Sequence, residues 1–267
     1  MLSGTRCAVL GSPIAHSRSP AMHRRAYAEL GLDWSYEAHE VDEDGLAPFL
    51  DGLDASWRGL SLTMPLKRVA VGLVDEVSDR VRAVSALNTI VFDEGRRIGD
   101  NTDVPGVTSA LTERGVAGVR RVVVVGAGAT AASCLSALRT DGLESATLVV
   151  RDPERATELA ALVRGWGVQV AIAQLGDPLP TADLLVSTVP SAAVEPYAAG
   201  WCARVGAVFD VIYDPWPTAL AASARDAGLP VASGLDLLAH QAALQVELMT
   251  GRSVDPATLR TAALESR

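Results

Sequence analysis

The sequence predicts an α/β protein in two parts, and three observations support this fold class. Arg121–Ser133 is RVVVVGAGATAAS, where four valines suit a buried parallel strand and the glycines suit a tight turn into a helix. Strand-length apolar runs alternate with helical patterns on both sides of this segment. The glycine turn begins only after residue 120 of 267, so a further α/β layer precedes it.

The glycine turn fits a nucleotide-binding pattern. Gly126, Gly128 and Ala131 match G-x-G-x-x-G/A. In this pattern the first glycine makes the turn, the second lets the backbone approach a pyrophosphate, and the third small residue lets the helix pack closely. Free N–H groups at the start of the expected helix, 129–139, would face the phosphates. A turn without a ligand is the alternative, but the strand–helix context favours nucleotide binding.

Composition excludes several classes of protein. A net charge of −9 argues against nucleic acid as a partner, because no basic field is available to meet phosphates. No run of about 18 apolar residues and no signal peptide is evident, so we expect a cytoplasmic protein without a membrane span. Cys7, Cys134 and Cys202 are far apart and are expected to be reduced core thiols. The four histidines lack a metal-ligand spacing, so no metal is expected.

The basic residues include a single lysine. Of the 23 Lys and Arg side chains, only Lys67 has a compact ammonium that can give up a proton. Pro65 begins a short helix and places Lys67 in its first turn, where a cation opposes the helix dipole. Chance survival of one surface lysine is the alternative, but both observations favour a chemical role.

The first part of the chain alternates strands and helices. We expect strands at 7–10, 34–41, 59–62, 90–92 and 97–100, and helices at 20–30, 46–53, from 65, and 104–114. Ser19 is expected to cap the first helix, with Pro20 in its first turn. Ser17 and Ser19 also place two hydroxyls where an anion is stabilised. Spacing alone favours the plainer alternative, in which Ser19 only caps and Ser17 is solvated.

The second part continues after the glycine turn. We expect strands at 146–150, 169–173, 184–187, 208–211 and 230–233, and helices at 153–165 and 234–250. The last helix carries His240, Gln241 and Gln245 among leucines and alanines. Polar groups in that setting are more often solvated than functional.

Ligands of open α/β sheets bind outside the carboxyl ends of the strands. In the first part of the chain these ends carry hydroxyl, amide, ammonium and carboxylate groups, which suit a polyhydroxylated, anionic small molecule. They are Ser17, Ser19, Thr63, Lys67, Asn88 and Asp103. Asp103 could equally be only the N-cap of the helix that follows it.

The end of strand 146–150 bears on the choice of dinucleotide. An Asp or Glu there holds the ribose 2′-OH of NAD, whereas an Arg accommodates the 2′-phosphate of NADP. Arg151 and Arg155, four apart at a helix start, could clamp a phosphate, which favours NADP. Asp152 and Glu154 interleave with them, and a plain charged helix start is the alternative.

Seven motifs together resemble shikimate dehydrogenases, the NADP-dependent oxidoreductases of chorismate and aromatic amino acid biosynthesis. They span nearly the whole chain: HSRSP (16–20), SLTMPLK (61–67), ALNTI (86–90), DNTD (100–103), GAGATAA (126–132), VIYDPWPT (211–218) and GLDLLAHQA (234–242). The resemblance implies a substrate-binding α/β domain at 1–103, completed by 237–267, and a Rossmann-type NADP-binding domain at 104–236. The C-terminal helix would pack back onto the N-terminal domain. Monomer and homodimer would both fit.

When the functional positions of the family are matched to this sequence one by one, the resemblance implies a role for each candidate residue. Lys67 and Asp103 correspond to the catalytic pair. The substrate carboxylate would meet Ser17, Ser19 and Tyr213, and the ring hydroxyls would meet Thr63, Asn88, Asp103 and Gln241. The cofactor-contact positions are Asp79, Gly126, Ala127, Gly128, Ala129, Thr130, Val150, Arg151, Asp152, Arg155, Val211 and Gly234.

The implied activity is the reversible NADPH-dependent reduction of 3-dehydroshikimate to shikimate, without a metal. Lys67 would donate the proton, and Asp103 would orient it. Departures from the family pattern lie at Ala129, Val150, Asp152 and Ser61. Asp152 could weaken the preference for NADP, and Ser61, in place of Asn, could leave one ring-hydroxyl contact shorter or water-mediated.

Three rival functions stay open at this point. One is a quinate/shikimate dehydrogenase that uses NAD, and another is a non-catalytic NADP-binding sensor of the same fold. A hydrolase built on Ser17 or Ser19 is the weakest rival, because no His–acid pair is evident beside either serine.

Overall fold

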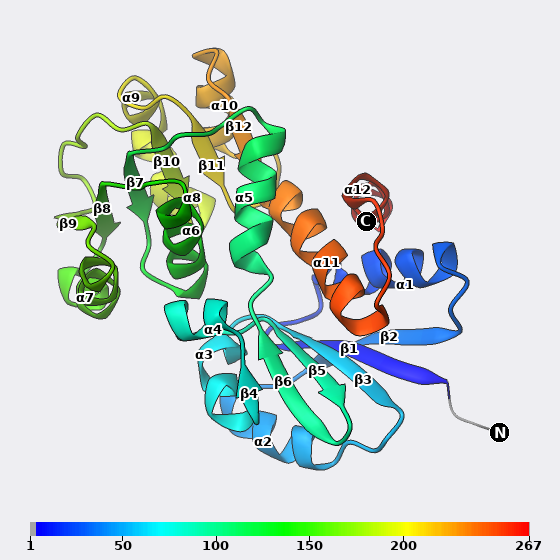
Figure 1. Ribbon diagram of the computed structural model, residues 1–267. Coiled ribbons are helices and arrows are strands. Elements are labelled where there is room, and N and C mark those ends of the chain that lie inside the picture. Colours follow the sequence, from blue (N-terminus) through cyan, green and yellow to red (C-terminus); the bar gives the residue numbers. More distant parts are fainter. Residues whose placement is uncertain (1–3, 267) are drawn as a thin grey trace. The chain divides into compact units, whose positions relative to one another are not determined.

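The computed structural model describes residues 4–266, which form two compact units. One unit runs to Asp103 and resumes at Leu238, and the other is Val104–Leu237. Each unit contains its own six-stranded sheet with helices packed on it (Figure 1). The predicted α/β fold class is therefore confirmed.

The sheet of the first unit mixes parallel and antiparallel strands in the order β2-β1-β3-β5-β6-β4. β2, β1 and β3 are parallel, whereas β5 runs antiparallel to both β3 and β6. Glu94 and Gly95 join β5 to β6 with positive φ angles of 48° and 78°, as a tight hairpin turn requires. The strands are β1 (Thr5–Gly11), β2 (Trp34–Glu40), β3 (Trp57–Leu62), β4 (Glu76–Val77), β5 (Thr89–Asp93) and β6 (Arg96–Asp100).

Helices pack on this sheet from within the same unit. α2, α3 and α4 contribute Leu46, Leu66 and Val81 to an apolar core with strand residues such as Leu60. α11 packs on β3 at Gly59, where a Cβ would lie 2.6 Å from Met249 Cγ. The C-terminal part of the chain thus packs on the N-terminal sheet, as predicted. The helices are α1 (Ser19–Glu29), α2 (Glu43–Asp51), α3 (Leu66–Val69), α4 (Asp79–Val84), α11 (Gly234–Thr250) and α12 (Pro256–Glu265), with a 3₁₀ turn at Ala70–Leu73.

The sheet of the second unit is parallel throughout, in the order β12-β11-β10-β7-β8-β9. The strand order reverses between β7 and β10, and ligands of such sheets bind outside the carboxyl ends at that point. The four valines of β7 are buried, as the sequence predicts. The strands are β7 (Arg121–Val125), β8 (Ser145–Val150), β9 (Gln169–Gln174), β10 (Leu184–Ser187), β11 (Val208–Asp210) and β12 (Val231–Ser233).

The core of the second unit joins the valines of β7 to Trp201 and Leu220 on helices of the same unit. The helices are α5 (Asp103–Glu113), α6 (Ala129–Thr140), α7 (Thr157–Gly165), α8 (Ser191–Val194), α9 (Ala198–Cys202) and α10 (Ala219–Asp226), with 3₁₀ turns at Pro153–Ala156 and Glu195–Tyr197. The helix expected over 153–165 therefore begins as a 3₁₀ turn. Among residues 4–266, no helix is long and apolar enough to cross a bilayer.

The N-cap predicted for the first helix is wrong by one residue. Ser19 is already helical, and Arg18 occupies the N-cap position. The hydroxyl that reaches a free backbone N–H comes instead from Ser17, whose Oγ accepts from Ser19 N at 3.4 Å. Pro20 has no N–H to be capped, so the start of the helix depends on a residue outside it.

Candidate active site

The centre of the candidate site is an ion pair between Lys67 and Asp103. Lys67 lies in the first turn of α3, as predicted, and Asp103 begins α5. Lys67 Nζ lies 2.5 Å from Asp103 Oδ2, and the two side chains are only 16% and 6% exposed. Because water screens this pair poorly, its attraction exceeds that of an ordinary surface ion pair. The ion pair holds the ammonium in one place, and the Lys67 side chain stays partly accessible to solvent.

Sheet topology explains why these residues meet. β5 is antiparallel to β3 and β6, so the start of β5 lies at the edge where β3 and β6 end. Asn88 precedes β5, and its backbone accepts from Leu62 N and donates to Asp100 O. Thr63 and Asp103 follow the strand ends at that edge. One edge thereby gathers the hydroxyl, amide, ammonium and carboxylate groups that the sequence distributes over 40 residues.

Asn88 orients the carboxylate from the other side. Its Nδ2 donates to Asp103 Oδ1 at 2.9 Å, and also lies 3.2 Å from Gln241 Oε1. Its Oδ1 accepts from Thr102 N at 2.8 Å. A backbone N–H can only donate, so the amide cannot flip without losing both contacts. Each oxygen of Asp103 therefore has its own donor, Asn88 for Oδ1 and Lys67 for Oδ2.

The expectation that polar groups on 234–250 are solvated is wrong for two residues. Gln241 is only 6% exposed and Gln245 only 1% exposed. Gln241 contacts Asn88, and Gln245 bonds to β3 and β5 residues. The helix packs on the sheet at Gly59, so the polar face beside that contact turns inward. This packing partner, remote in sequence, was not visible from helical periodicity.

Gly11 lets two loops of the candidate site approach each other. A Cβ at Gly11 would lie 2.4 Å from Thr63 Cγ2 and 2.8 Å from Met64 O. Ser12 N donates to Met64 O at 3.0 Å, which joins the loop of Ser17 to the segment that carries Lys67. Ser17 and Thr63 thus belong to loops that are anchored to one another, and Ser19 follows at the start of α1.

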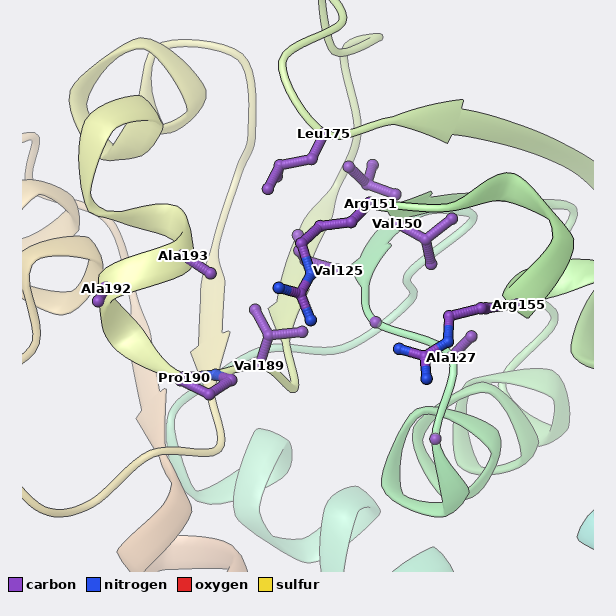
Figure 2. A pocket seen from close by; sticks show the side chains of 13 residues that line it. Val125, Ala127, Val150, Arg151, Arg155, Leu175, Val189, Pro190, Ala192 and Ala193 are labelled. Atoms are coloured by element: carbon purple, nitrogen blue, oxygen red, sulfur yellow. The ribbon is translucent and has the colours of Figure 1, made fainter.

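The glycine turn of the second unit opens into a cavity of about 640 Å³ (Figure 2). Gly126 has a φ of +105°, and a Cβ there would lie 2.3 Å from Thr188 Oγ1, so only glycine fits this turn. Gly128 is the N-cap of α6, so the first backbone N–H groups of this helix have no acceptor within the helix itself. The strand–turn–helix context that the sequence predicts is confirmed.

Two arginines line the same cavity. In Figure 2 the guanidinium groups of Arg151 and Arg155 point into the hollow, with Val189 and Pro190 opposite Arg155. The other lining residues are Val125, Gly126, Ala127, Gly128, Val149, Val150, Leu175, Ala192 and Ala193. Asp152 is not among the residues lining this cavity. Its Oδ1 accepts from Glu154 N at 3.1 Å, which engages that carboxylate with its own turn.

The predicted cofactor contacts do not include the apolar wall of this cavity. Leu175, Val189, Pro190, Ala192 and Ala193 carry no chemical group that a motif would reveal. Leu175 directly follows β9, and the others lie in the loop after β10 and in α8, which fits the rule that ligands bind outside the carboxyl ends of parallel strands. Applying that rule to every strand of the second part would have indicated these residues from the sequence.

The remaining predicted residues lie in both units. Asp79, in the first unit, begins α4, is exposed and pairs with Arg82. Val211 and Tyr213 follow β11 in a segment that Asp210 anchors at both ends. Asp210 Oδ1 accepts from Ile212 N, Oδ2 accepts from Thr218 Oγ1 at 2.7 Å, and burial raises the pKa of this carboxyl.

Gly234 is held against this segment. A Cβ at Gly234 would lie 1.9 Å from Val211 O, so the two backbones approach as closely as glycine permits. Across the described residues, 4–266, no group of three or more His, Cys, Asp or Glu side chains is placed to hold a metal ion.

The dinucleotide cavity on the parallel sheet of the second unit, together with the lysine–carboxylate pair of the first unit, defines a two-unit α/β oxidoreductase. The family described as "Shikimate dehydrogenase substrate binding domain" matches residues 9–90, "Shikimate / quinate 5-dehydrogenase" matches 110–195, and "Shikimate 5'-dehydrogenase C-terminal domain" matches 234–264. The chain belongs to the shikimate dehydrogenase family.

Relatives and solved structures agree with this assignment. A shikimate dehydrogenase (NADP(+)) from one strain of Thermus thermophilus is 39% identical over 97% of both chains. The crystal structure of a shikimate 5-dehydrogenase from Mycobacterium fortuitum has a TM-score of 0.88 and 40% identity, covering 98% of both chains. The enzyme from another strain of Thermus thermophilus, solved in complex with NADP(H) and shikimate, has a TM-score of 0.85 and 35% identity. That match covers 98% of this chain and 100% of the other.

Proposed function

We propose that the protein catalyses the reversible, NADPH-dependent reduction of 3-dehydroshikimate to shikimate. The observation that carries the proposal is the Lys67–Asp103 pair, in which both carboxylate oxygens are engaged and the lysine side chain is partly exposed. A reduction that turns a ketone into an alcohol needs a proton donor where negative charge develops. Family membership supplies the substrate and the cofactor of this proposal.

The first unit would bind the substrate. Ser17 and Ser19, at the start of α1, would donate hydroxyl hydrogen bonds to the substrate carboxylate, with Tyr213 of the second unit. Thr63, Asn88, Asp103 and Gln241 would bind the ring hydroxyls. Four of these residues are buried polar groups, which is unusual unless each has a partner. They are Ser19, Asn88, Asp103 and Gln241.

The second unit would bind NADPH. The cavity of about 640 Å³ has a glycine turn that brings backbone close to a pyrophosphate and two arginines suited to a 2′-phosphate. These features fit the cofactor, and the carboxylate of Asp152 is engaged elsewhere. Gly126, Ala127, Gly128, Ala129 and Thr130 would surround the pyrophosphate. Val150, Arg151, Asp152 and Arg155 would form the segment at the 2′-phosphate, and Asp79, Val211 and Gly234 are proposed further contacts.

When bound, NADPH supplies the hydride that goes to the ring carbonyl carbon. Lys67 stabilises the charge that develops on the carbonyl oxygen and transfers a proton from Nζ to it. Asp103 holds Nζ in line through Oδ2 while Asn88 fixes its other oxygen. No step requires a metal, because the ammonium takes the electrophilic role.

The test is the absorbance of reduced nicotinamide with shikimate and NADP⁺. Fast turnover with this pair, and slow turnover with NAD⁺ or quinate, is the expected result. Equal use of NAD⁺ or quinate would instead make the protein a quinate/shikimate dehydrogenase. Cofactor binding with no turnover on either acid would make it a sensor.

The Lys67→Ala variant tests the role of the lysine. We expect kcat to fall by about three orders of magnitude, in the range that removal of an acid and its charge produces. The Kd for NADP⁺, measured by calorimetry, should stay within twofold, because Lys67 belongs to the other unit from the glycine turn. Near-normal turnover by this variant would contradict the mechanism.

We further propose that the protein works in the cytoplasm as a monomer or homodimer. Its cysteines, Cys7, Cys134 and Cys202, are all buried, and none of the three forms a disulfide, as a reducing compartment permits. Burial raises the pKa of the Cys7 thiol to about 11, which makes that group unreactive. Sedimentation analysis of the purified chain, with fractionation of cells that express it, would decide both points.

A further inference from the structure

A chain of buried hydrogen bonds leads from the body of the first unit to the candidate site. Gln245 is at its centre and is 1% exposed. Its Nε2 donates to Asn88 O at 3.1 Å and to Thr89 Oγ1 at 3.0 Å. Its Oε1 accepts from Ser61 Oγ at 2.8 Å, and Ser61 Oγ accepts from Tyr36 Oη–H at 2.6 Å. α11 is thereby connected to three strands of one sheet.

The direction of donation along this chain is determined. Asn88 O can only accept, so Gln245 must present Nε2 to it and Oε1 to Ser61. Thr89 Oγ1 accepts from Gln245, which leaves its hydrogen free to donate to Asn88 Oδ1 at 2.8 Å. Asn88 Nδ2 then donates to Asp103 Oδ1. From Tyr36 to Asp103, every hydroxyl and side-chain amide of this series donates to the next group toward Asp103, so neighbouring hydrogen bonds polarise one another.

We propose that Gln245 is a positioning residue for the reaction, a role that rests on the proposed function. The hydrogen bonds of Gln245 go to Ser61, Asn88 and Thr89, and not to the Lys67–Asp103 pair. It holds the Thr89 hydroxyl as a donor, which holds the Asn88 amide with Nδ2 toward Asp103. Asp103 in turn holds Lys67 Nζ at the position from which it transfers a proton.

This assignment also explains Ser61. The side chain lies where many family members have Asn, and the sequence predicts that one ring-hydroxyl contact is shorter or water-mediated there. In the structure Ser61 is 3% exposed, accepts from Tyr36 and donates to Gln245. Its hydroxyl is engaged inside the protein and supports the site indirectly. Ser61 therefore belongs to the positioning chain and not to the substrate-contact set.

Gln245→Met is the first variant, because it keeps the length of the side chain and removes both polar groups. We expect kcat for shikimate oxidation to fall about tenfold or more, since small misplacements at a reacting centre have effects of this size. The KM for NADP⁺ should stay within twofold. Thermal unfolding of each variant, followed by fluorescence, shows how much of it is folded at the assay temperature.

Thr89 offers a matched pair that separates positioning from packing. Thr89→Ser removes a methyl group and keeps the hydroxyl, whereas Thr89→Val keeps the shape and removes the hydroxyl. Thr89 is fully buried, so a packing role predicts that the serine variant is the more damaged. The positioning role predicts the reverse order in kcat, with the valine variant lower by about tenfold.

Two buried tyrosines of the same core give a further control. Tyr36→Phe removes the hydroxyl that begins the chain and should lower kcat a few-fold. Tyr27→Phe removes the hydroxyl of another buried tyrosine. That hydroxyl lies 4.0 Å from Met249 Sδ and is not part of the chain of hydrogen bonds, so this variant should leave kcat unchanged.

The two proposals fail in different ways. If the wild-type protein does not turn over shikimate, the proposed function fails. If the wild type is active, and folded Gln245→Met and Thr89→Val retain wild-type kcat, the positioning role is overturned. A loss of kcat in Gln245→Met with Thr89→Ser below Thr89→Val would also overturn it, in favour of packing. If Gln245→Met does not fold, the Thr89 and Tyr36 variants decide the question.

Discussion

His23 should make the protein lose stability as the pH falls below 6.5. The imidazole is fully buried, and its Nδ1 lies 2.9 Å from Ser19 O. The ring stacks on Tyr36 with centroids 4.0 Å apart, and Nε2 is buried without a hydrogen-bond partner. Burial lowers the pKa of His23 from 6.5 to about 4, because the charged ring would have no water around it.

The size of the effect follows from this pKa. Between about pH 4 and 6.5 the unfolded chain binds a proton at His23 that the folded chain does not, so stability rises with pH. The neutral imidazole of His23 makes its full contribution to the free energy of unfolding above pH 6.5, and this contribution is lost as the pH falls through about 4. At about 1.4 kcal/mol per pH unit, the full loss is about 3 kcal/mol, and roughly 2 kcal/mol of it is lost by pH 5.

Urea unfolding followed by tryptophan fluorescence at pH 7.5 and pH 5.0 measures this effect. His23→Asn keeps a donor near the Nδ1 position and does not titrate. The wild type should be the more stable at pH 7.5, and its advantage should shrink by about 2 kcal/mol at pH 5.0. His16→Asn, at an exposed position, controls for the loss of a histidine. If wild type and His23→Asn lose stability in parallel, the buried-histidine argument is refuted.

Two further predictions concern the second unit. Gly234→Ala would place a Cβ 1.9 Å from Val211 O and should lower the free energy of unfolding by about 3 kcal/mol or more, as thermal unfolding would measure. Gly200→Ala is the control and should not destabilise the protein, because the space around Gly200 is open. Arg155→Gln should raise the KM for NADP⁺ about tenfold or more and leave the KM for NAD⁺ unchanged, because a charged hydrogen bond to a phosphate is lost. Arg164→Gln is its control and should move neither KM more than twofold, because that arginine does not line the cavity and donates to Val170 O instead. An equal effect of Arg155→Gln on both cofactors would contradict the role of Arg155.

Local chemistry made the strand–turn–helix at Gly126 and the position of Lys67 predictable. These predictions depend on a run of valines, a glycine with positive φ and a proline at a helix start. Each of these acts over a few residues, so its effect does not depend on the tertiary structure. The cap of α1 was placed on Ser19 because spacing alone cannot decide which of two nearby serines enters the helix. Gln245 was expected in solvent because nothing local indicates that a sheet covers it.

The sequence by itself determined the fold class, the glycine turn of the second unit and the identity of the groups available for chemistry. These depend on side-chain size, on backbone freedom and on the period of apolar residues, all of which are local properties. Only the tertiary structure decided which of those groups meet. Asn88, Asp103 and Gln241 are brought together because β5 runs antiparallel to its neighbours and α11 packs on the same sheet, and both arrangements depend on contacts between residues far apart in the chain.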